Sequence, residues 1–406
     1  MSSNDNLVLK YDTQYLSLSY DEKLSQINLS RSLPEDYDDH KIISINNNLI
    51  SNLNNHQIFI IDSKISPINS TSYSLYESVL KPIFQILGIN YTYLKTNSSN
   101  SIKEYADLIN NDSEKYLILF ISGDTTIFEF INYVYSNYQN NLNNIPNLTI
   151  LPFPHGTGNA LSISMNNLND LNSIEKLFNW NQKHLPIYQL NSNNNLIPIN
   201  DSLNTLQNKN ILFTVVASWC LHSTLVYESD KPELRNNYGS ERFRIAANKI
   251  LAENPVFKGK ITLQPDNKSF IYNGNKWSLD SINSNSFTDL SYLVVAAVPN
   301  FEKTFKISPH STIESDELHL ITIPLVPSDK TISLMNDAYN NGIHINNPLV
   351  GYEKISKTKT LEIEIDNSMS SKLSIVCLDG SSWEVTGNDR KLSITTFDQS
   401  FLYYLS

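Results

Sequence analysis

Two stretches decide the fold: LILFISGDTTIFEFIN at residues 117–132 and PHGTGNAL at residues 154–161. In the first, a continuous apolar run ends in Ser122, Gly123 and Asp124, and a helical pattern of apolar residues follows directly. A buried parallel strand that leads into a helix has this pattern, and the amides at the start of such a helix attract phosphate groups. The stretch therefore predicts an α/β sheet with an anion-binding turn at a strand's carboxyl end.

The second stretch repeats this arrangement after the next strand pattern. Gly156 and Gly158 allow close approach of the backbone, and Thr157 and Asn159 supply hydrogen-bonding side chains where the next helix begins. An ordinary glycine-rich turn would look the same in isolation. Two such turns after successive strands would face one edge of a sheet, which favours a nucleotide-binding site there.

Strand and helix patterns alternate regularly around these turns. Strands are predicted at residues 57–62, 89–95, 116–121 and 147–153, and helices at residues 74–88, 101–110, 125–138 and 158–168. This alternation predicts a parallel sheet wound by right-handed crossovers. We expect a nucleotide-binding α/β domain at residues 56–180, preceded by a partly disordered extension at residues 1–55 with one hairpin.

After residue 185 the pattern changes to short β-type runs separated by polar turns, as in a sandwich or a curled antiparallel sheet. Helical patterns interrupt these runs at residues 240–251 and 328–339. The sequence thus predicts a second, mainly antiparallel β-sandwich domain at residues 181–406. The cleft between the two domains is the expected place for a site.

Charge and composition exclude several classes of partner. The 406 residues carry a formal net charge of -11, which argues against a broad nucleic-acid surface and leaves only local, peripheral membrane contact. No stretch approaches the ~18 apolar residues of a transmembrane segment. Cys220 and Cys377 both lie in apolar runs, as buried small side chains do, which suits a reducing compartment and a cytoplasmic protein.

Asp124 is the candidate with the most chemical options. At a strand's carboxyl end it could hold a magnesium ion through water, or accept a proton from a substrate hydroxyl. It could equally cap a helix, with Thr125 and Thr126 as first-turn residues. The segment alone leaves these alternatives open.

The two turns together resemble the catalytic domain shared by diacylglycerol kinases, sphingosine kinases, ceramide kinases and bacterial lipid kinases. Those proteins carry GGDGT or SGDG, followed by P-x-G-[ST]-G-N-A. Later segments at residues 218–243 (SWCLHSTLVYESDKPELRNNYGSERF), 307–323 (ISPHSTIESDELHLITI) and 378–385 (LDGSSWEV) resemble further parts of the family. The resemblance runs from about residue 56 to residue 400.

The resemblance implies an ATP- and Mg²⁺-dependent lipid kinase that transfers the γ-phosphoryl group to a hydroxyl of a sphingoid base, ceramide or diacylglycerol at a membrane surface. It implies that either Asp124 or Asp379 is the catalytic base, with Asp124 also near the metal. The nucleotide site would be lined by Ser122, Gly123, Thr125, Thr126, Gly156, Thr157, Gly158, Asn159, Thr96, Arg235 and Arg242.

The sequence also departs from the family pattern. Thr125 replaces a glycine, Ser381 stands where a glutamate would follow Gly380, and Thr224 takes the place of the acidic residue that binds a sphingoid amine. These changes raise a second interpretation, a degenerate member that binds nucleotide or lipid without phosphorylating it. A relative of NAD kinase or phosphofructokinase is a third, since those proteins share the GGD turn.

The first phosphate loop departs as well, because the chain has no glycine between residues 62 and 87. The side chains that could replace such a loop are Ser63, Lys64, Ser66 and Ser70.

Overall fold

The computed structural model describes residues 6–32, 42–63, 73–110, 115–193, 196–199, 203, 206, 210–239, 241–281 and 287–406. The chain divides into two compact units. The first contains Met1–Ile127, Asn137–Leu185 and Phe401–Ser406, and the second contains Phe128–Ser136 and Pro186–Ser400.

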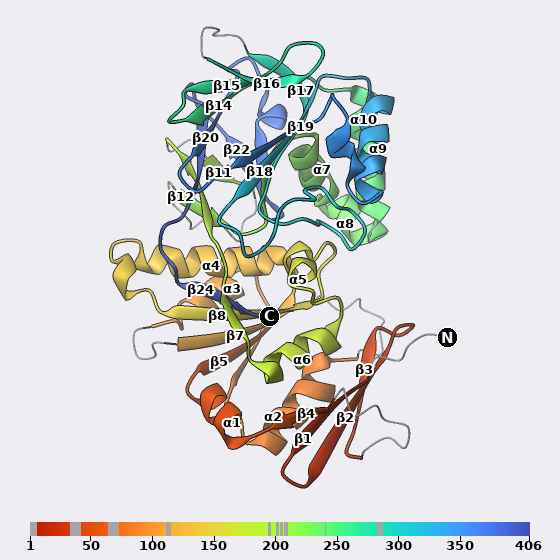
Figure 1. Cartoon of the computed structure of the whole chain (residues 1–406), viewed down its shortest axis with the longest axis vertical. Coiled ribbons are helices and arrows are strands. Elements are labelled where there is room, and N and C mark those ends of the chain that lie inside the picture. Colours follow the sequence, from red (N-terminus) through yellow and green to blue (C-terminus); the bar gives the residue numbers. More distant parts are fainter. Residues whose placement is uncertain are drawn as a thin grey trace. The chain divides into compact units, whose positions relative to one another are not determined.

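The first unit is built on a six-stranded sheet (Figure 1). In spatial order its strands are β6 (Thr92–Lys95), β5 (Gln57–Asp62), β7 (Lys115–Ser122), β8 (Asn147–Pro154), β24 (Leu402–Leu405) and β9 (Gln182–His184). All neighbours are parallel except β24 and β9. Because β6 lies on one side of β5 and β7 on the other, the winding reverses between β5 and β7. Ligands bind at such a reversal in open α/β sheets.

Helices connect these strands much as the alternating pattern predicts. They are α1 (Asn47–Asn54), a π-helical turn at Tyr76–Leu80, α2 (Lys81–Leu87), α3 (Ser101–Ala106), α4 (Asp124–Tyr138), α5 (Ala160–Ser164) and α6 (Asp170–Asn179). The apolar run in β7 is buried on both faces, as expected of a central parallel strand. The predicted wound parallel sheet is therefore confirmed.

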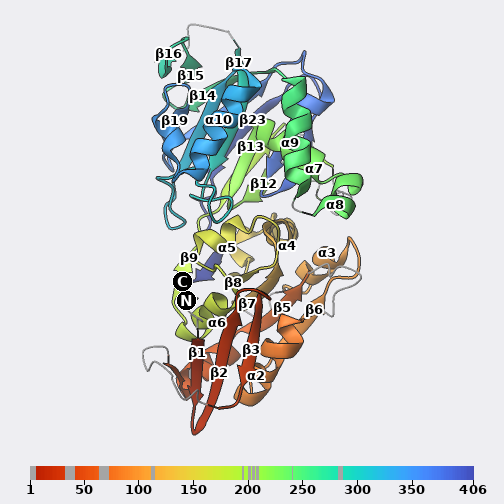
Figure 2. The same ribbon diagram turned by 90° about the vertical axis from the view of Figure 1, so that its right-hand side faces the viewer.

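A second, four-stranded sheet precedes the parallel one. Its order is β3 (Gln26–Ser30), β2 (Gln14–Asp21), β1 (Asn6–Tyr11) and β4 (Ile42–Ile45). β1 and β2 form a hairpin, and their alternating leucines, such as Leu7 and Leu16, join the apolar core that α6 and β5 also fill. Figure 2 shows β1, β2 and β3 side by side, and α6 packs against β2, β3 and β4.

The second unit contains a 14-stranded, mainly antiparallel curled sheet, which confirms the predicted fold class. Its strands are β10 (Tyr188–Ser192), β11 (Leu196–Pro198), β12 (Asn210–Phe213), β13 (Val216–Cys220), β14 (Phe257–Gln264), β15 (Lys268–Tyr272), β16 (Trp277–Ser281), β17 (Thr288–Ala296), β18 (Leu318–Pro324), β19 (Gly351–Ile355), β20 (Thr360–Ile365), β21 (Ile375–Leu378), β22 (Ser381–Val385) and β23 (Lys391–Thr396).

Four α-helices accompany this sheet within the described residues. They are α7 (Leu221–Ser229), α8 (Pro232–Tyr238), α9 (Glu241–Glu253) and α10 (Ser328–Tyr339). The apolar run ILFTVVAS at residues 211–218 is one of the short β-type runs of the sequence and predicts a single strand, but a bend at Thr214 and Val215 divides it between β12 and β13. In the part of the chain that the structure describes, no helix is both long and apolar enough to cross a bilayer.

Candidate active site

The two predicted turns lie in direct backbone contact. They follow β7 and β8, which are paired as far as Ser122 and Pro154. A Cβ atom added to Gly156 would lie 2.4 Å from the Cα of Gly123, and one added to Gly123 would lie 2.9 Å from the Cα of Gly156. Gly123 has an ordinary φ of -99°, so it is the lack of space, not the conformation, that requires glycine here.

The Asp124 carboxylate joins the starts of two helices. Asp124 is the first residue of α4, and its Oδ2 and Oδ1 accept hydrogen bonds from the amides of Ala160 (2.6 Å) and Leu161 (3.2 Å), which open α5. The side chain thus caps the neighbouring helix. Burial raises the pKa of the Asp124 carboxyl to about 6, against the two amide hydrogen bonds, which lower it.

Asn159 closes the second turn upon itself. Its backbone is left-handed (φ 55°), its Oδ1 accepts from the amide of Gly156 (2.7 Å), and its Nδ2 donates to the Gly156 carbonyl (2.8 Å). Asn159 therefore shapes the turn rather than reaching outward. Because Asp124 and Asn159 already occupy the amides of Gly156, Ala160 and Leu161, the start of α4 is the better place to attract an anion.

Hydroxyl groups from two other strand ends lie at the same sheet edge. The Oγ1 of Thr126 is 2.9 Å from the Oγ of Ser63, which directly follows β5. Thr96, after β6, donates from its amide to the carbonyl of Asp62 at 2.9 Å. The structure thus brings Ser63, Thr96 and Thr126 to the point where the winding reverses. Lys64, Ser66 and Ser70 lie outside the described residues.

The remaining predicted residues of the first unit fall within the two turns. Ser122 is buried, Thr125 and Gly158 are half-buried, and Thr157 is exposed. The two turns thus bring together Ser122, Gly123, Asp124, Thr125, Thr126, Gly156, Thr157, Gly158 and Asn159.

Asp379 lies in the second unit, and backbone amides of the same unit bind its carboxylate. With Gly380 it forms the tight turn between β21 and β22, and both residues have positive φ angles (45° and 87°). The residue is 3% exposed, and its carboxylate accepts hydrogen bonds from the amides of Thr214 (2.7 Å), Val215 (3.0 Å) and Val216 (2.8 Å). The Thr214 hydroxyl adds a fourth, at 3.2 Å. Asp379 therefore fixes the turn that separates β12 from β13.

The two arginines, also in the second unit, differ in their surroundings. Arg235 is exposed on α8. The side chain of Arg242 on α9 is only 11% exposed, lies 3.7 Å from the Asp230 carboxylate, and donates to the carbonyl of Gly239 at 3.0 Å. Burial lowers the pKa of Arg242, against the Asp230 carboxylate, which raises it. Arg242 thus already has a carboxylate partner within its own unit.

Two of the departures from the family pattern lie deep in the second unit. The Thr224 hydroxyl donates to the Cys220 carbonyl at 2.9 Å, so it is committed to the backbone. Ser381 is fully buried, and its Oγ lacks a hydrogen-bond partner among the described residues. Neither side chain supplies a carboxylate.

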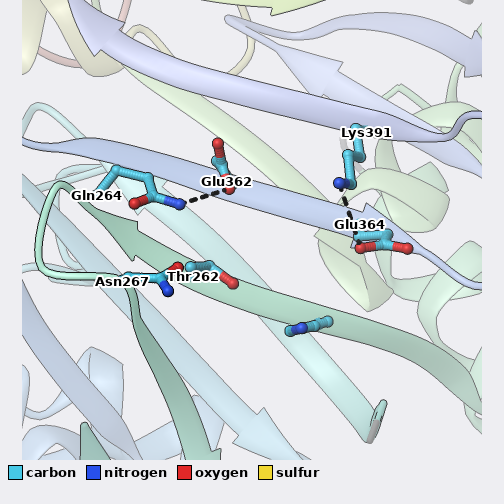
Figure 3. Close-up of a pocket in the computed structure, with 7 residues that line it drawn as sticks. Thr262, Gln264, Asn267, Glu362, Glu364 and Lys391 are labelled. Atoms are coloured by element: carbon cyan, nitrogen blue, oxygen red, sulfur yellow. Dashed lines mark hydrogen bonds and ion pairs between the residues drawn. The ribbon is translucent and has the colours of Figure 1, made fainter. Parts of the chain in front are cut away.

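The sheet of the second unit also carries a polar pocket of about 270 Å³ (Figure 3). In it Gln264 donates to Glu362 at 3.2 Å, and Lys391 lies 4.0 Å from Glu364. These side chains project from β14, β20 and β23 and pair with one another. The pocket contains none of the residues that the motifs single out.

Sequence reasoning missed one pair of polar side chains beside the second turn of the first unit. The imidazole Nε2 of His155 lies 2.9 Å from Oδ1 of Asp170. An imidazole side chain directly before Gly156, between the end of β8 and the second turn, was the signal that could have found it.

The side chains at the two turns suit a metal ion that takes most of its ligands from a bound nucleotide and from water. Within the described ranges, no three or more His, Cys, Asp or Glu side chains cluster so as to hold a metal ion. Asp124 alone is placed at the turns, and each of its oxygens keeps a lone pair beyond the one used by an amide. Mg²⁺ is commonly held by one or two carboxylates, substrate phosphates and water, so this donor set fits a nucleotide-bound ion.

Comparison with known proteins places the two turns inside a recognised domain. Residues 68–190 match the family model of the diacylglycerol kinase catalytic domain. No curated protein sequence matches the chain.

Three similar solved structures are proteins of Bacillus anthracis str. Sterne assigned as diacylglycerol kinases. The first is 15% identical, with a TM-score of 0.57, over 86% of this chain and 97% of that one. The others are 14% and 13% identical, with TM-scores of 0.54 and 0.51, each over 86% of this chain and 96% of theirs. At these identities the likeness establishes the fold.

Proposed function

We propose that this chain, whose residues 68–190 match the family model of the diacylglycerol kinase catalytic domain, transfers the γ-phosphoryl group of ATP to a lipid hydroxyl. One observation carries the proposal. The backbone contact between Gly123 and Gly156 sets two turns against each other at the carboxyl ends of β7 and β8, with the Asp124 carboxylate beside them. Phosphoryl transfer depends mainly on such positioning and on charge stabilisation.

In this proposal Asp124 is the group that accepts the proton of the lipid hydroxyl. It is partly exposed, and its raised pKa of about 6 suits a base that works near neutral pH. Asp379 is a poorer candidate, because four hydrogen-bond donors already occupy its oxygens. We therefore assign Asp379 a structural role.

The nucleotide phosphates are proposed to lie at the start of α4, with the hydroxyls of Ser63 and Thr126 at its side. Magnesium, when bound, neutralises charge on the phosphates. A carboxylate bound directly to the ion could not also take a proton, so we assign Asp124 contact with the ion only through water. Arg235 and Arg242 are the proposed cations of the second unit.

The second unit is proposed to bind the lipid, and the acceptor to be a sphingoid base, a ceramide or a diacylglycerol presented at a membrane surface. Peripheral contact with that membrane is part of the proposal, as is a cytoplasmic location. Thr224 supplies no carboxylate for a sphingoid amine, which favours the uncharged acceptors.

The test uses the full chain, radiolabelled ATP and Mg²⁺. The acceptors, offered in turn, are vesicles that carry sphinganine, ceramide or diacylglycerol, and NAD in solution. We expect label in one lipid class, none in NAD, and loss of labelling in Asp124→Asn. Label in NAD alone would contradict the proposal and favour the NAD kinase interpretation.

A second candidate is a family member that binds ATP or lipid without transferring phosphate. The buried Ser381, which stands where the family has a carboxylate, favours it. ATP binding by the full chain with no labelled lipid from any acceptor is the outcome that would select this candidate.

A further inference from the structure

His155 stands between the end of β8 and the turn that begins at Gly156. Its amide donates to the carbonyl of Ser122 at 3.2 Å and to that of Phe153 at 2.8 Å. The first of these bonds ties the second turn to the last residue of β7. The backbone of His155 is thus the point from which the turn departs toward Gly156.

The side chain of His155 points to a buried carboxylate. Nε2 lies 2.9 Å from Oδ1 of Asp170, and the two side chains are only 11% and 5% exposed. An ionised carboxylate only accepts hydrogen bonds, so Nε2 carries the proton. A hydrogen bond to an ionised carboxylate is charge-assisted, so it is stronger than one between neutral groups.

Asp170 belongs to a helix that is itself firmly held. It is the first residue of α6, whose N-cap Asn169 accepts from the amide of Asn172 at 2.9 Å. Ser173 on α6 and Asn167 just before it both donate to the carbonyl of Pro152 in β8, at 2.8 Å and 3.0 Å. The start of α6 is thus bound at Pro152 in β8 and at His155 directly after β8.

The other side of α6 packs against the four-stranded sheet of β1 to β4, the N-terminal sheet. Leu171, Ile174 and Leu177 are buried in the same apolar core as the leucines of β1 and β2. This close packing restricts movement of α6, so the Asp170 side chain on α6 holds a well-defined position next to the turn.

From this geometry we infer that His155 and Asp170 are a positioning pair, which holds the second turn at the distance from Gly123 that nucleotide binding requires. The backbone contact between Gly123 and Gly156 leaves little tolerance for displacement. The N-terminal sheet then acts as the outer support of the turn, through α6. This inference rests on the proposed function for its effect on nucleotide, but not for its effect on the turn.

The experiment compares His155→Leu with His155→Gln in the full chain. Gln can place an amide N–H near the position of Nε2, whereas Leu cannot donate. We expect His155→Leu to raise the KM for ATP about tenfold, the equivalent of one charge-assisted hydrogen bond, with a much smaller change in kcat. His155→Gln should restore most of the loss. His184→Leu, at an exposed residue of β9, is the matched control.

Hydrogen exchange of the ligand-free chain gives a second measurement that needs no enzyme activity. The amides of Gly156, Ala160 and Leu161 are hydrogen-bonded to side chains in the intact turn. We expect them to exchange faster in His155→Leu and to remain protected in His155→Gln and His184→Leu.

Two results would overturn the inference. One is unchanged exchange of these amides in His155→Leu. The other is an unchanged KM in an active enzyme that merely melts at a lower temperature, which would make the pair structural only. If the wild-type chain neither binds nor uses ATP, the proposed function fails, and exchange alone decides whether the pair holds the turn.

Discussion

Gly156 and Gly123 are pressed together so closely that a methyl group on the first would lie 2.4 Å from the Cα of the second. Real Cβ contacts are not that short, so any larger residue at Gly156 must push the two turns apart. The contact involves backbone on both sides, which cannot rotate away as a flexible side chain can.

Gly156→Ala should therefore abolish nucleotide binding while leaving most of the chain folded. We expect a rise of at least tenfold in the dissociation constant of a fluorescent ATP analogue, because the two turns of the proposed nucleotide site no longer meet. Gly259→Ala is the matched control, since its added carbon would lie 2.5 Å from the Trp219 ring in the second unit. Equal loss of binding in both variants would show that general destabilisation, not the turn contact, is responsible.

Asp124→Asn should remove catalysis without weakening the fold. A positioned base contributes ~100- to 10,000-fold to turnover, and we expect a loss in that range. The folded chain holds the Asp124 proton more tightly than the unfolded chain, so ionisation of this group lowers the free energy of unfolding as pH rises from 3.8 to about 6. Asn cannot ionise, which removes this cost at pH 7.5, but it keeps an acceptor for only one of the two amides, and the loss of the other hydrogen bond offsets part of the gain. Urea unfolding at pH 7.5 should show a midpoint no lower than that of the wild type.

The pH dependence of turnover should report the same carboxyl. If Asp124 must be ionised to accept a proton, kcat falls as pH drops through about 6. The acid limb of a kcat profile between pH 5 and 8 measures this directly. A limb centred near pH 4 would show that a different or an unshifted carboxyl acts as the base.

Asp379→Ala should act on stability first. It would leave three buried amides and one hydroxyl without their acceptor, a loss of about 3–5 kcal/mol in the free energy of unfolding. Asp379→Asn keeps one acceptor oxygen and tolerates the left-handed backbone, so we expect an intermediate loss. Denaturant unfolding of both variants measures the difference. A wild-type midpoint combined with lost turnover in Asp379→Ala would instead identify Asp379 as a catalytic residue.

The wound sheet and its two turns could be predicted because their signals are local. The apolar run of β7, the glycines and the helical patterns lie within a few residues of one another. The sequence predicts that the turns of Gly123 and Gly156 are neighbours, because the parallel strands before them end at one edge of the sheet. It does not predict how close the two backbones come. His155 escaped notice because its partner, Asp170, lies on the following helix.

Asp379 shows why the rest could not be predicted. Its motif identifies it as a carboxylate of interest, but whether its oxygens are available depends on Thr214 to Val216, far away in sequence. The same residues explain why one expected strand became β12 and β13. Local propensity favours a continuous strand there, and a distant acceptor overrides it.

The place of β24 in the first sheet bears on how the chain folds during synthesis. β24 pairs with both β8 and β9, yet Pro186–Ser400 lies between β9 and β24 along the sequence. While the ribosome makes that long insertion, the side of β8 that later pairs with β24 has no partner strand. This free edge can pair with a wrong strand. The free edge of the nascent parallel sheet therefore stays open to wrong pairing until residue 405 emerges.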